Sequence, residues 1–219
     1  MALVIAALVF AGFSRSFYLW PWFHGRPLTP FRIVHGVLFS AWILLFFVQT
    51  SLVAAARTDI HRRLGVAGAL LAAVMVLVGT GLAVAGARQG HAPPGLDPHR
   101  FLAIPLFDML VFPVLVGAAI YFRRRPETHK RLMLLATVSL VAAAAARLPT
   151  ALAAAGPLFY FGVVDALLLA GVAYDLITRG KVHPAYLWGG LLVVVSQPLR
   201  LALAGSHAWL VFAQMLTAR

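Results

Sequence analysis

The sequence predicts an all-α polytopic membrane protein, folded as one bundle of seven transmembrane helices. Of its 219 residues, 62% are hydrophobic and only 11% are charged, and the mean hydropathy is +0.92. A typical soluble domain is roughly 45–50% apolar and about 25% charged. In addition, seven stretches each approach the 20 or so apolar residues that a membrane crossing requires. These observations exclude an ordinary soluble domain, a disordered chain and a fibrous repeat.

The limits of the predicted spans come from charged residues, glycine and proline, because the stretches are apolar on all sides. In chain order the spans cover residues 2–22, 31–56, 64–87, 101–122, 132–155, 157–178 and 185–203. The first begins without positive charge and stays apolar past Arg15, so we expect a retained helix and not a signal peptide. Residues 206–219 could extend the last helix or lie in the interface with Trp209 as an anchor. The loops are too short for a second domain.

Basic residues are distributed unequally between the two sets of loops. One side receives ten of them: Arg57, Arg62, Arg63, Arg123, Arg124, Arg125, Lys130, Arg131, Arg179 and Lys181. The opposite side receives Arg26, Arg88, Arg100 and Arg219. Because Lys and Arg accumulate on the cytoplasmic side, we expect a bacterial inner-membrane protein with a cytoplasmic amino terminus and a periplasmic carboxyl terminus. The net charge of the chain is +12, and we expect the basic residues at the ends of the spans to contact anionic lipid headgroups. This charge therefore does not indicate a nucleic-acid partner.

Several kinds of active site are excluded by what the chain lacks. It has no cysteine, which rules out disulfides, thiolate metal sites, iron–sulfur clusters, covalently attached haem and cysteine nucleophiles. It also has no HExxH, GxSxG or Walker motif. The reaction class therefore has to be sought in polar residues inside the spans.

Charged side chains gather at one depth of the predicted bundle. Asp108 and Asp165 lie seven and eight residues into their spans, which is roughly 10–12 Å below the periplasmic edge at about 1.5 Å per residue. Arg15, Arg147 and Arg200 reach the same third of the bilayer from three other spans. An ionisable group costs at least ~2.5 kcal/mol at the bilayer centre, so convergence of opposite charges is expected.

We therefore predict a periplasm-facing pocket that contains Asp108, Asp165 and Arg147, with Arg15 or Arg200 at its edge. The alternative is purely structural: ion pairs that hold the bundle together, or arginines that extend to the headgroups. Asp175 lies near the cytoplasmic end of its span and is expected to pair with Arg179.

One face of the second span carries polar residues at a spacing of seven. His35, Trp42 and Gln49 fall on one stripe because a heptad drifts by only about 20° on a helix. The stripe is either ordinary helix packing or one wall of a cofactor or ligand pocket.

Four histidines alternate between the two membrane faces. His35 and His99 lie at the periplasmic ends of the second and fourth spans, and His61 and His129 at the cytoplasmic starts of the third and fifth. Two imidazoles from facing helices are what a bis-imidazole haem requires. This order resembles the di-haem transmembrane cytochromes of the ascorbate-reducible b type, whose second and fourth helices share one haem and whose third and fifth share the other.

The resemblance implies b-type haem iron bound by the pairs His35/His99 and His61/His129, and electron transfer within the membrane, with a quinone as a candidate partner. Arg15, Arg147 or Arg200 could bind the propionates through charge-assisted hydrogen bonds. Without the resemblance, His61 and His129 can also be read as headgroup contacts, because Arg and Lys flank them.

Two segments resemble those of uncharacterised bacterial multi-pass membrane proteins. They are HGVLFSAWILLFFVQTSLVAAARTDIHRRLG at 35–65 and FRRRPETHKRLMLLAT at 122–137. This resemblance supports the helix pattern and implies no activity.

Three functional hypotheses follow from these residues. The first is haem-based membrane electron transfer. The second is a non-redox transporter, sensor or accessory subunit, in which the Asp–Arg cluster binds a small ligand, a proton or a lipid headgroup. The third is a metal-dependent hydrolase with His35, Asp108 and Asp165 as ligands. A homo-oligomer or a subunit of a membrane complex is compatible with each.

Overall fold

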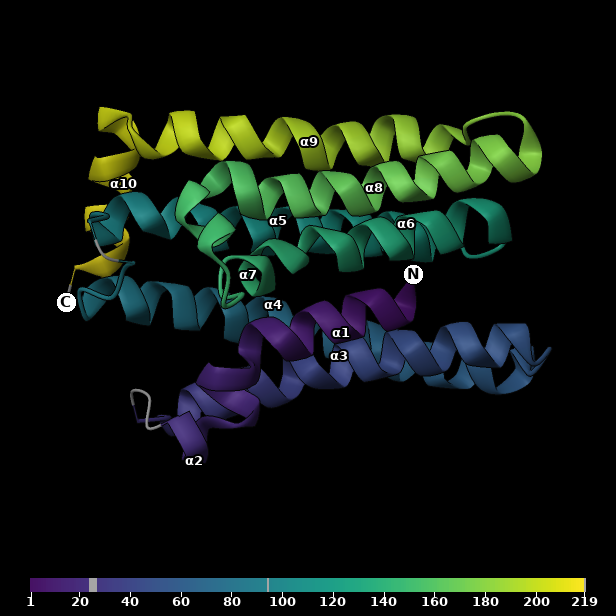
Figure 1. The fold of residues 1–219 in the computed structure, drawn as a ribbon, viewed down its shortest axis with the longest axis horizontal. Helices are drawn as coiled ribbons and strands as arrows, with labels where there is room; N and C mark the ends of the chain where they lie inside the picture. Colours follow the sequence, from purple (N-terminus) through teal and green to yellow (C-terminus); the bar gives the residue numbers. More distant parts are fainter. Residues whose placement is uncertain (24–26, 94, 219) are drawn as a thin grey trace.

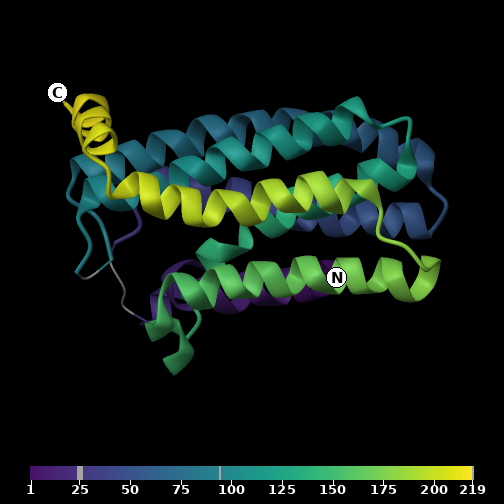
Figure 2. The same cartoon turned by 90° about the horizontal axis from the view of Figure 1, so that it is seen from above.

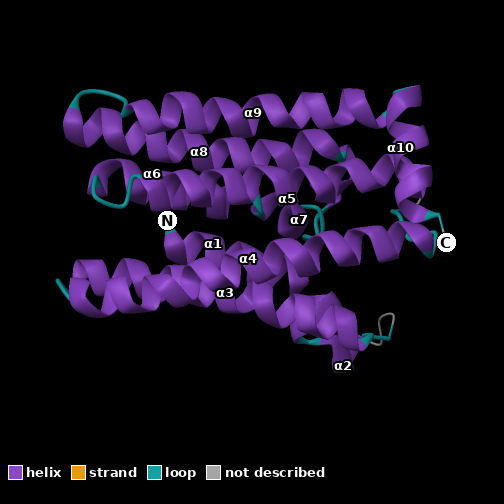
Figure 3. Cartoon of the chain, turned by 180° about the vertical axis from the view of Figure 1, so that it is seen from behind, coloured by secondary structure: helices purple, strands orange, loops and turns teal. Residues whose placement is uncertain are grey.

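The computed structural model describes residues 1–23, 27–93 and 95–218. Arg26 and Arg219, which entered the topology prediction, lie outside these residues. The described residues form helices joined by short turns, without a β-strand among them (Figure 3). The predicted all-α class is therefore confirmed.

Five of the described helices are long and apolar enough to cross a membrane, as expected of an integral membrane protein. They correspond to the second, third, fourth, sixth and seventh predicted spans, and they run side by side along the longest axis of the molecule (Figure 1). They are α3 (Pro30–Ala54), α4 (Thr58–Arg88), α5 (Pro98–Tyr121), α8 (Pro157–Arg179) and α9 (Pro184–Ala204).

Proline and capping side chains determine where most of these helices begin. A proline stands in the first turn of α3, α5, α8 and α9, where its missing N–H removes no helical hydrogen bond. Thr29 Oγ1 accepts a hydrogen bond from the Arg32 N–H at 3.3 Å, and Asp97 Oδ1 accepts one from the Arg100 N–H at 2.9 Å. Because these signals are local, the predicted starts of these four helices agree with the observed ones to within a few residues.

The other two predicted spans, 2–22 and 132–155, are interrupted, so seven crossings are not confirmed. At the breaks, Ser14 Oγ donates to the Ala11 carbonyl at 2.7 Å and Ser139 Oγ donates to the Ala136 carbonyl at 2.9 Å. Hydroxyl groups that bond back in this way bend helices. The pieces are α1 (Ala2–Phe13), the π-helical η1 (Ser14–Tyr18) and α2 (Trp20–Phe23), then α6 (Pro126–Ser139), α7 (Val141–Ala145) and the 3-10 helix η2 (Ala151–Ala155).

The break after α6 sends α7 towards α1. A Cβ atom at Gly12 of α1 would lie only 2.2 Å from the Ala144 carbonyl oxygen of α7, so the two backbones meet at a distance that glycine alone allows. Between α3, α5 and α6 the core is closely packed around Trp42, whose indole N–H donates to Thr137 Oγ1 at 3.3 Å and whose ring meets Phe112 edge-on.

The tail forms a separate helix, α10 (His207–Thr217). It lies across the end of the bundle at an angle to α9 (Figures 1 and 2). Trp209 is buried there, and its indole N–H donates to the His99 carbonyl at 2.8 Å. Trp209 therefore anchors α10 to α5 and is not exposed as an interfacial anchor would be.

The ten basic residues of the more basic loops gather at one end of the molecule. The turns at 55–57, 122–125 and 180–183 lie at this end (Figure 1), and we call it the basic end. The opposite end carries α2, the residues 89–93 and 95–97, and α10.

Candidate functional site

Two histidines meet at the basic end, one from the first turn of α4 and the other from the first turn of α6. The ring centroids of His61 and His129 are 6.2 Å apart, and their planes are at 85°. His129 Nδ1 lies 2.8 Å from the Ala119 carbonyl oxygen of α5. Since a carbonyl only accepts, Nδ1 carries the proton, and the lone pair of this imidazole is on Nε2.

A third side chain, from α3, joins this pair. Gln49 Nε2 donates to the His61 carbonyl at 3.2 Å. The Gln49 Oε1 and His61 Nδ1 atoms are buried, and neither has a hydrogen-bond partner among the described residues. Buried polar atoms nearly always have one. We call the group His61, His129, Gln49 and Ala119 the His61–His129 site. Its two unsatisfied atoms leave hydrogen-bonding capacity there, as the buried Nδ1 atoms of His35 and His91 do elsewhere.

The other predicted histidine pair is divided between two environments. His35 stacks on Phe39 with the ring centroids 4.1 Å apart. His99 Nε2 lies 3.0 Å from Thr217 Oγ1 of α10. No ring contact joins His35 to His99 in the part of the chain that the structure describes. The sequence did not indicate that α10 folds back onto the start of α5, where it contacts His99.

Asp108 and Arg200 form a buried ion pair between α5 and α9. Arg200 Nη1 lies 2.5 Å from Asp108 Oδ1, and both residues are buried. The same guanidinium donates to the Ser196 carbonyl at 3.1 Å and to Ser196 Oγ at 2.9 Å, and it lies over the rings of Phe107 and Phe161. The charges and donors of this pair are thus largely satisfied by the protein, as in a structural brace.

Asp165 and Arg147 do not join this pair, so the predicted three-residue pocket needs correction. Asp165 Oδ1 accepts a hydrogen bond from Gln197 Nε2 at 2.8 Å. Arg147 donates to the Ala143 carbonyl at 2.6 Å and lies over the Phe13 ring of α1. Among the described residues no ion pair joins Arg147 to either aspartate. The helix break after α6 carries Arg147 to α1, and Arg200, expected only at the edge, takes its place.

Two further predicted site residues lie elsewhere. Arg15 is exposed, with its guanidinium over the Phe23 ring of α2, and Trp42 belongs to the packed core. The described residues contain no group of three or more His, Cys, Asp or Glu side chains that could hold a metal ion. The hydrolase hypothesis, which required His35 and both aspartates together, therefore loses its geometric basis.

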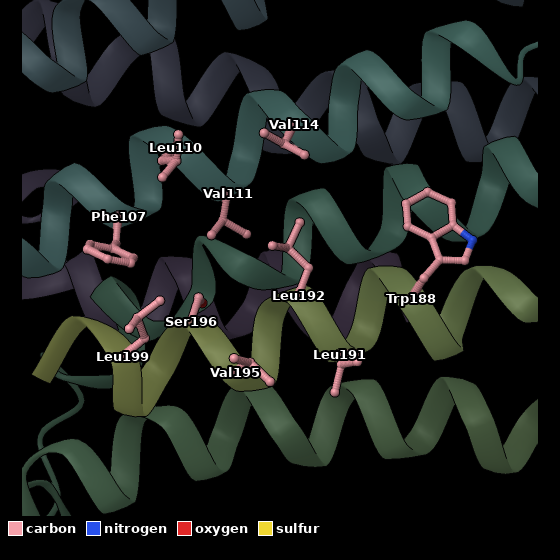
Figure 4. Close-up of a pocket in the computed structure, with 10 residues that line it drawn as sticks. All are labelled: Phe107, Leu110, Val111, Val114, Trp188, Leu191, Leu192, Val195, Ser196 and Leu199. Carbon is pink, nitrogen blue, oxygen red and sulfur yellow. The ribbon is translucent and has the colours of Figure 1, made fainter. Parts of the chain in front are cut away.

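An apolar groove runs along the outside of the bundle between α5 and α9 (Figure 4). Its volume is about 390 Å³. Ser196 is the one hydroxyl in a lining that is otherwise apolar, so the groove suits a hydrocarbon chain. The lining residues are Phe107, Leu110, Val111, Val114, Trp188, Leu191, Leu192, Val195, Ser196 and Leu199.

A charged cluster at the basic end connects α6 with α8. Arg131, which is buried, donates two hydrogen bonds to the Asp175 carboxylate and two, both at 2.7 Å, to the carbonyl and the carboxylate of Glu127. Arg179, the predicted partner of Asp175, lies farther from it at 3.9 Å. Hydrogen bonds from Lys130 and then from Arg131 lower the pKa of Glu127 to about 2. From sequence alone Arg131 is expected in a solvent loop, so this cluster could not be predicted.

Comparison with known proteins adds no assignment. No protein-family model, curated protein or solved structure matches this chain. The resemblance to di-haem cytochromes and to multi-pass families therefore stays a prediction, and function has to be argued from the residues themselves.

Proposed function

We propose that this membrane protein binds one b-type haem between His61 and His129 and carries electrons within the membrane. The observation that carries the proposal is the separation of 6.2 Å between the two imidazole centroids. Two imidazole nitrogens on opposite sides of one metal are each about 2 Å from it, and the ring centres lie behind them, which gives a centroid separation of roughly 6 Å.

The number of ligands favours haem over a bare metal ion. A structural zinc site uses four protein ligands and a catalytic one uses three. Here no third His, Cys, Asp or Glu completes such a group among the described residues. Haem iron needs only the two axial ligands from the protein, because the porphyrin supplies the other four, and when bound it supplies one-electron transfer.

The neighbouring residues have roles that suit this occupant. The Ala119 carbonyl would hold the His129 ring by its Nδ1 proton, which fixes the orientation of an iron ligand and raises its basicity. Arg62 follows His61 directly and has no carboxylate partner in the described residues, so it could bind a propionate. Gln49 Oε1, which is unsatisfied, is an acceptor for a protonated propionate or a water molecule.

This proposal differs from the di-haem arrangement in stoichiometry. His35 and His99 have separate neighbours, so we expect one haem per chain. The basic end would be cytoplasmic by the positive-inside rule, which puts the haem near that face of the inner membrane. A quinone remains a candidate electron partner.

The test is an absorption spectrum of the protein purified after expression with ample haem. We expect a Soret band at about one haem per chain, with loss of most of that band in His61→Ala and in His129→Ala. His35→Ala and His99→Ala are matched controls, because they remove the histidines that the sequence alone would have ranked equally. A wild-type protein without a Soret band, or equal loss in all four variants, would contradict the proposal.

A second candidate is the non-redox function, and Asp165 favours it. Its carboxylate is only partly buried, with one hydrogen bond, from Gln197, among the described residues. Such a group could bind a proton or a small cationic ligand. If Asp165→Asn abolishes a transport or sensing phenotype that His61→Ala leaves unchanged, this second function is the better one.

A further inference from the structure

A cavity of about 420 Å³ lies at the turn between α8 and α9, at the basic end. We call it the turn pocket. Its lining is Arg179, Lys181, Val182, His183 and Pro184. It is separate from the His61–His129 site, which lies between α3, α4, α5 and α6.

The positive charge of the turn pocket is not fully neutralised by the protein. Glu127 Oε2 pairs with Arg179 at 2.6 Å, but the same carboxylate also binds Lys130 and Arg131. Lys181 is exposed and forms no ion pair within the described residues. Two carboxylates, those of Glu127 and Asp175, therefore face four cations.

His183 is not counted among the cations of the turn pocket. Burial, and then the nearby Arg131 cation, lower the pKa of His183, which favours its neutral form. The ring Nδ1 of His183 accepts a hydrogen bond from the Ala185 backbone N–H at 3.1 Å, and the backbone N–H of His183 donates to Asp175 Oδ2 at 3.3 Å. The cationic groups that line the turn pocket are thus Arg179, which shares the Glu127 carboxylate with Lys130 and Arg131, and Lys181, which forms no ion pair within the described residues. This excess of positive charge suits an anion.

The surroundings of the turn pocket indicate that this anion carries apolar chains. Ile177 and Leu187, on either side of the turn, are 84% and 64% exposed, and side chains of this kind on a membrane protein face lipid. The apolar groove of Figure 4 begins at Trp188, about one helical turn along α9 from Pro184. A headgroup in the turn pocket therefore has lipid-facing surface beside it and an apolar groove within reach of an acyl chain.

We propose that the turn pocket binds the phosphate of an anionic phospholipid, with Arg179 and Lys181 as its cationic ligands. Basic pockets at the ends of transmembrane helices bind acidic headgroups in this way. The proposal does not depend on haem binding, since none of its residues belongs to the His61–His129 site.

The test is native mass spectrometry of the delipidated protein in detergent, titrated with phosphatidylglycerol or with phosphatidylcholine. We expect phosphatidylglycerol to bind more tightly. Arg179→Gln/Lys181→Gln should weaken its binding by on the order of tenfold or more, given the contribution of each basic side chain near an acidic headgroup. The control Arg123→Gln/Arg124→Gln removes the same charge from another turn of the same end and should leave that binding unchanged.

Lys181→Gln alone guards against misfolding, because this exposed side chain forms no ion pair in the described part of the chain. It should weaken phosphatidylglycerol binding by a smaller factor at unchanged thermal stability. Equal binding of the two lipids, or equal weakening in the control, would overturn the proposal. So would competition by inorganic phosphate at the concentration at which phosphatidylglycerol binds, since the ligand would then be the free anion.

Discussion

Removing Arg200 tests how strongly the buried ion pair braces α5 against α9. Arg200→Met keeps an unbranched side chain but leaves the Asp108 carboxylate, on a residue that is only 7% exposed, without its charged partner. Loss of one member of a buried pair costs about 3–5 kcal/mol, because the remaining charge is both desolvated and unpaired. Here the Ser196 hydroxyl and carbonyl also lose a donor, so we expect the upper part of that range.

The double variant Asp108→Leu/Arg200→Met separates charge from packing. It removes both charges, so it should be more stable than Arg200→Met alone. Asp59→Asn is the control, because Asp59 and Arg57 are 3.5 Å apart with both side chains more than half exposed, and such pairs contribute at most about 1 kcal/mol.

The free energy of unfolding is measured in mixed micelles, by circular dichroism, as the fraction of denaturing detergent rises. If Arg200→Met is as stable as Asp59→Asn, the pair is not a brace. The single variant Asp108→Leu completes the cycle. If the double variant loses as much free energy of unfolding as Arg200→Met and Asp108→Leu added together, the two charges are not coupled.

Three other predictions concern acid stability, helix packing and topology. Since Lys130 and then Arg131 lower the pKa of Glu127 from about 4.5 to about 2, the ionised carboxylate stabilises the fold above about pH 4.5. This contribution is lost as the pH falls towards 2, so the apparent Tm should drop less in Glu127→Gln than in wild type, and equal drops would contradict this. Gly12→Ala should lower the apparent Tm because its Cβ would meet the Ala144 oxygen, whereas Gly117→Ala, with nothing within 4 Å, should not lower it; equal losses would refute the close α1–α7 contact. An alkaline phosphatase fusion after Gln89 should be active and one after Arg124 inactive, and the reverse would invert the proposed orientation.

The long helices could be predicted from sequence because their signals are local. Residues such as Thr29 and Pro30, or Asp97 and Pro98, cap and start a helix whatever surrounds it. The breaks near Ser14 and after Ser139 could not be predicted in this way. Serine is common inside membrane helices, and whether its hydroxyl bends the chain depends on the tertiary contacts around it.

The candidate sites were predicted in part. Depth along a helix correctly indicated that Asp108 would need an opposite charge, but it could not distinguish Arg147 from Arg200, because that choice depends on how each helix is rotated and where it breaks. The resemblance to the di-haem cytochromes implied that His61 and His129 would pair, and their rings do lie close together. The same resemblance implied a pair of His35 and His99, and their separation could not be predicted, because the contact of His99 with Thr217 depends on how the tail packs.

Electron paramagnetic resonance of the oxidised, haem-loaded protein tests the central claim most directly. With the His61 and His129 planes at 85°, bound ferric haem should give a low-spin signal with the strong anisotropy of perpendicular axial imidazoles. We expect His129→Ala and His61→Ala each to abolish it, while His99→Ala retains it. A high-spin signal in the wild type, or a low-spin signal that survives loss of either His61 or His129, would contradict the assignment of these two residues as the ligands.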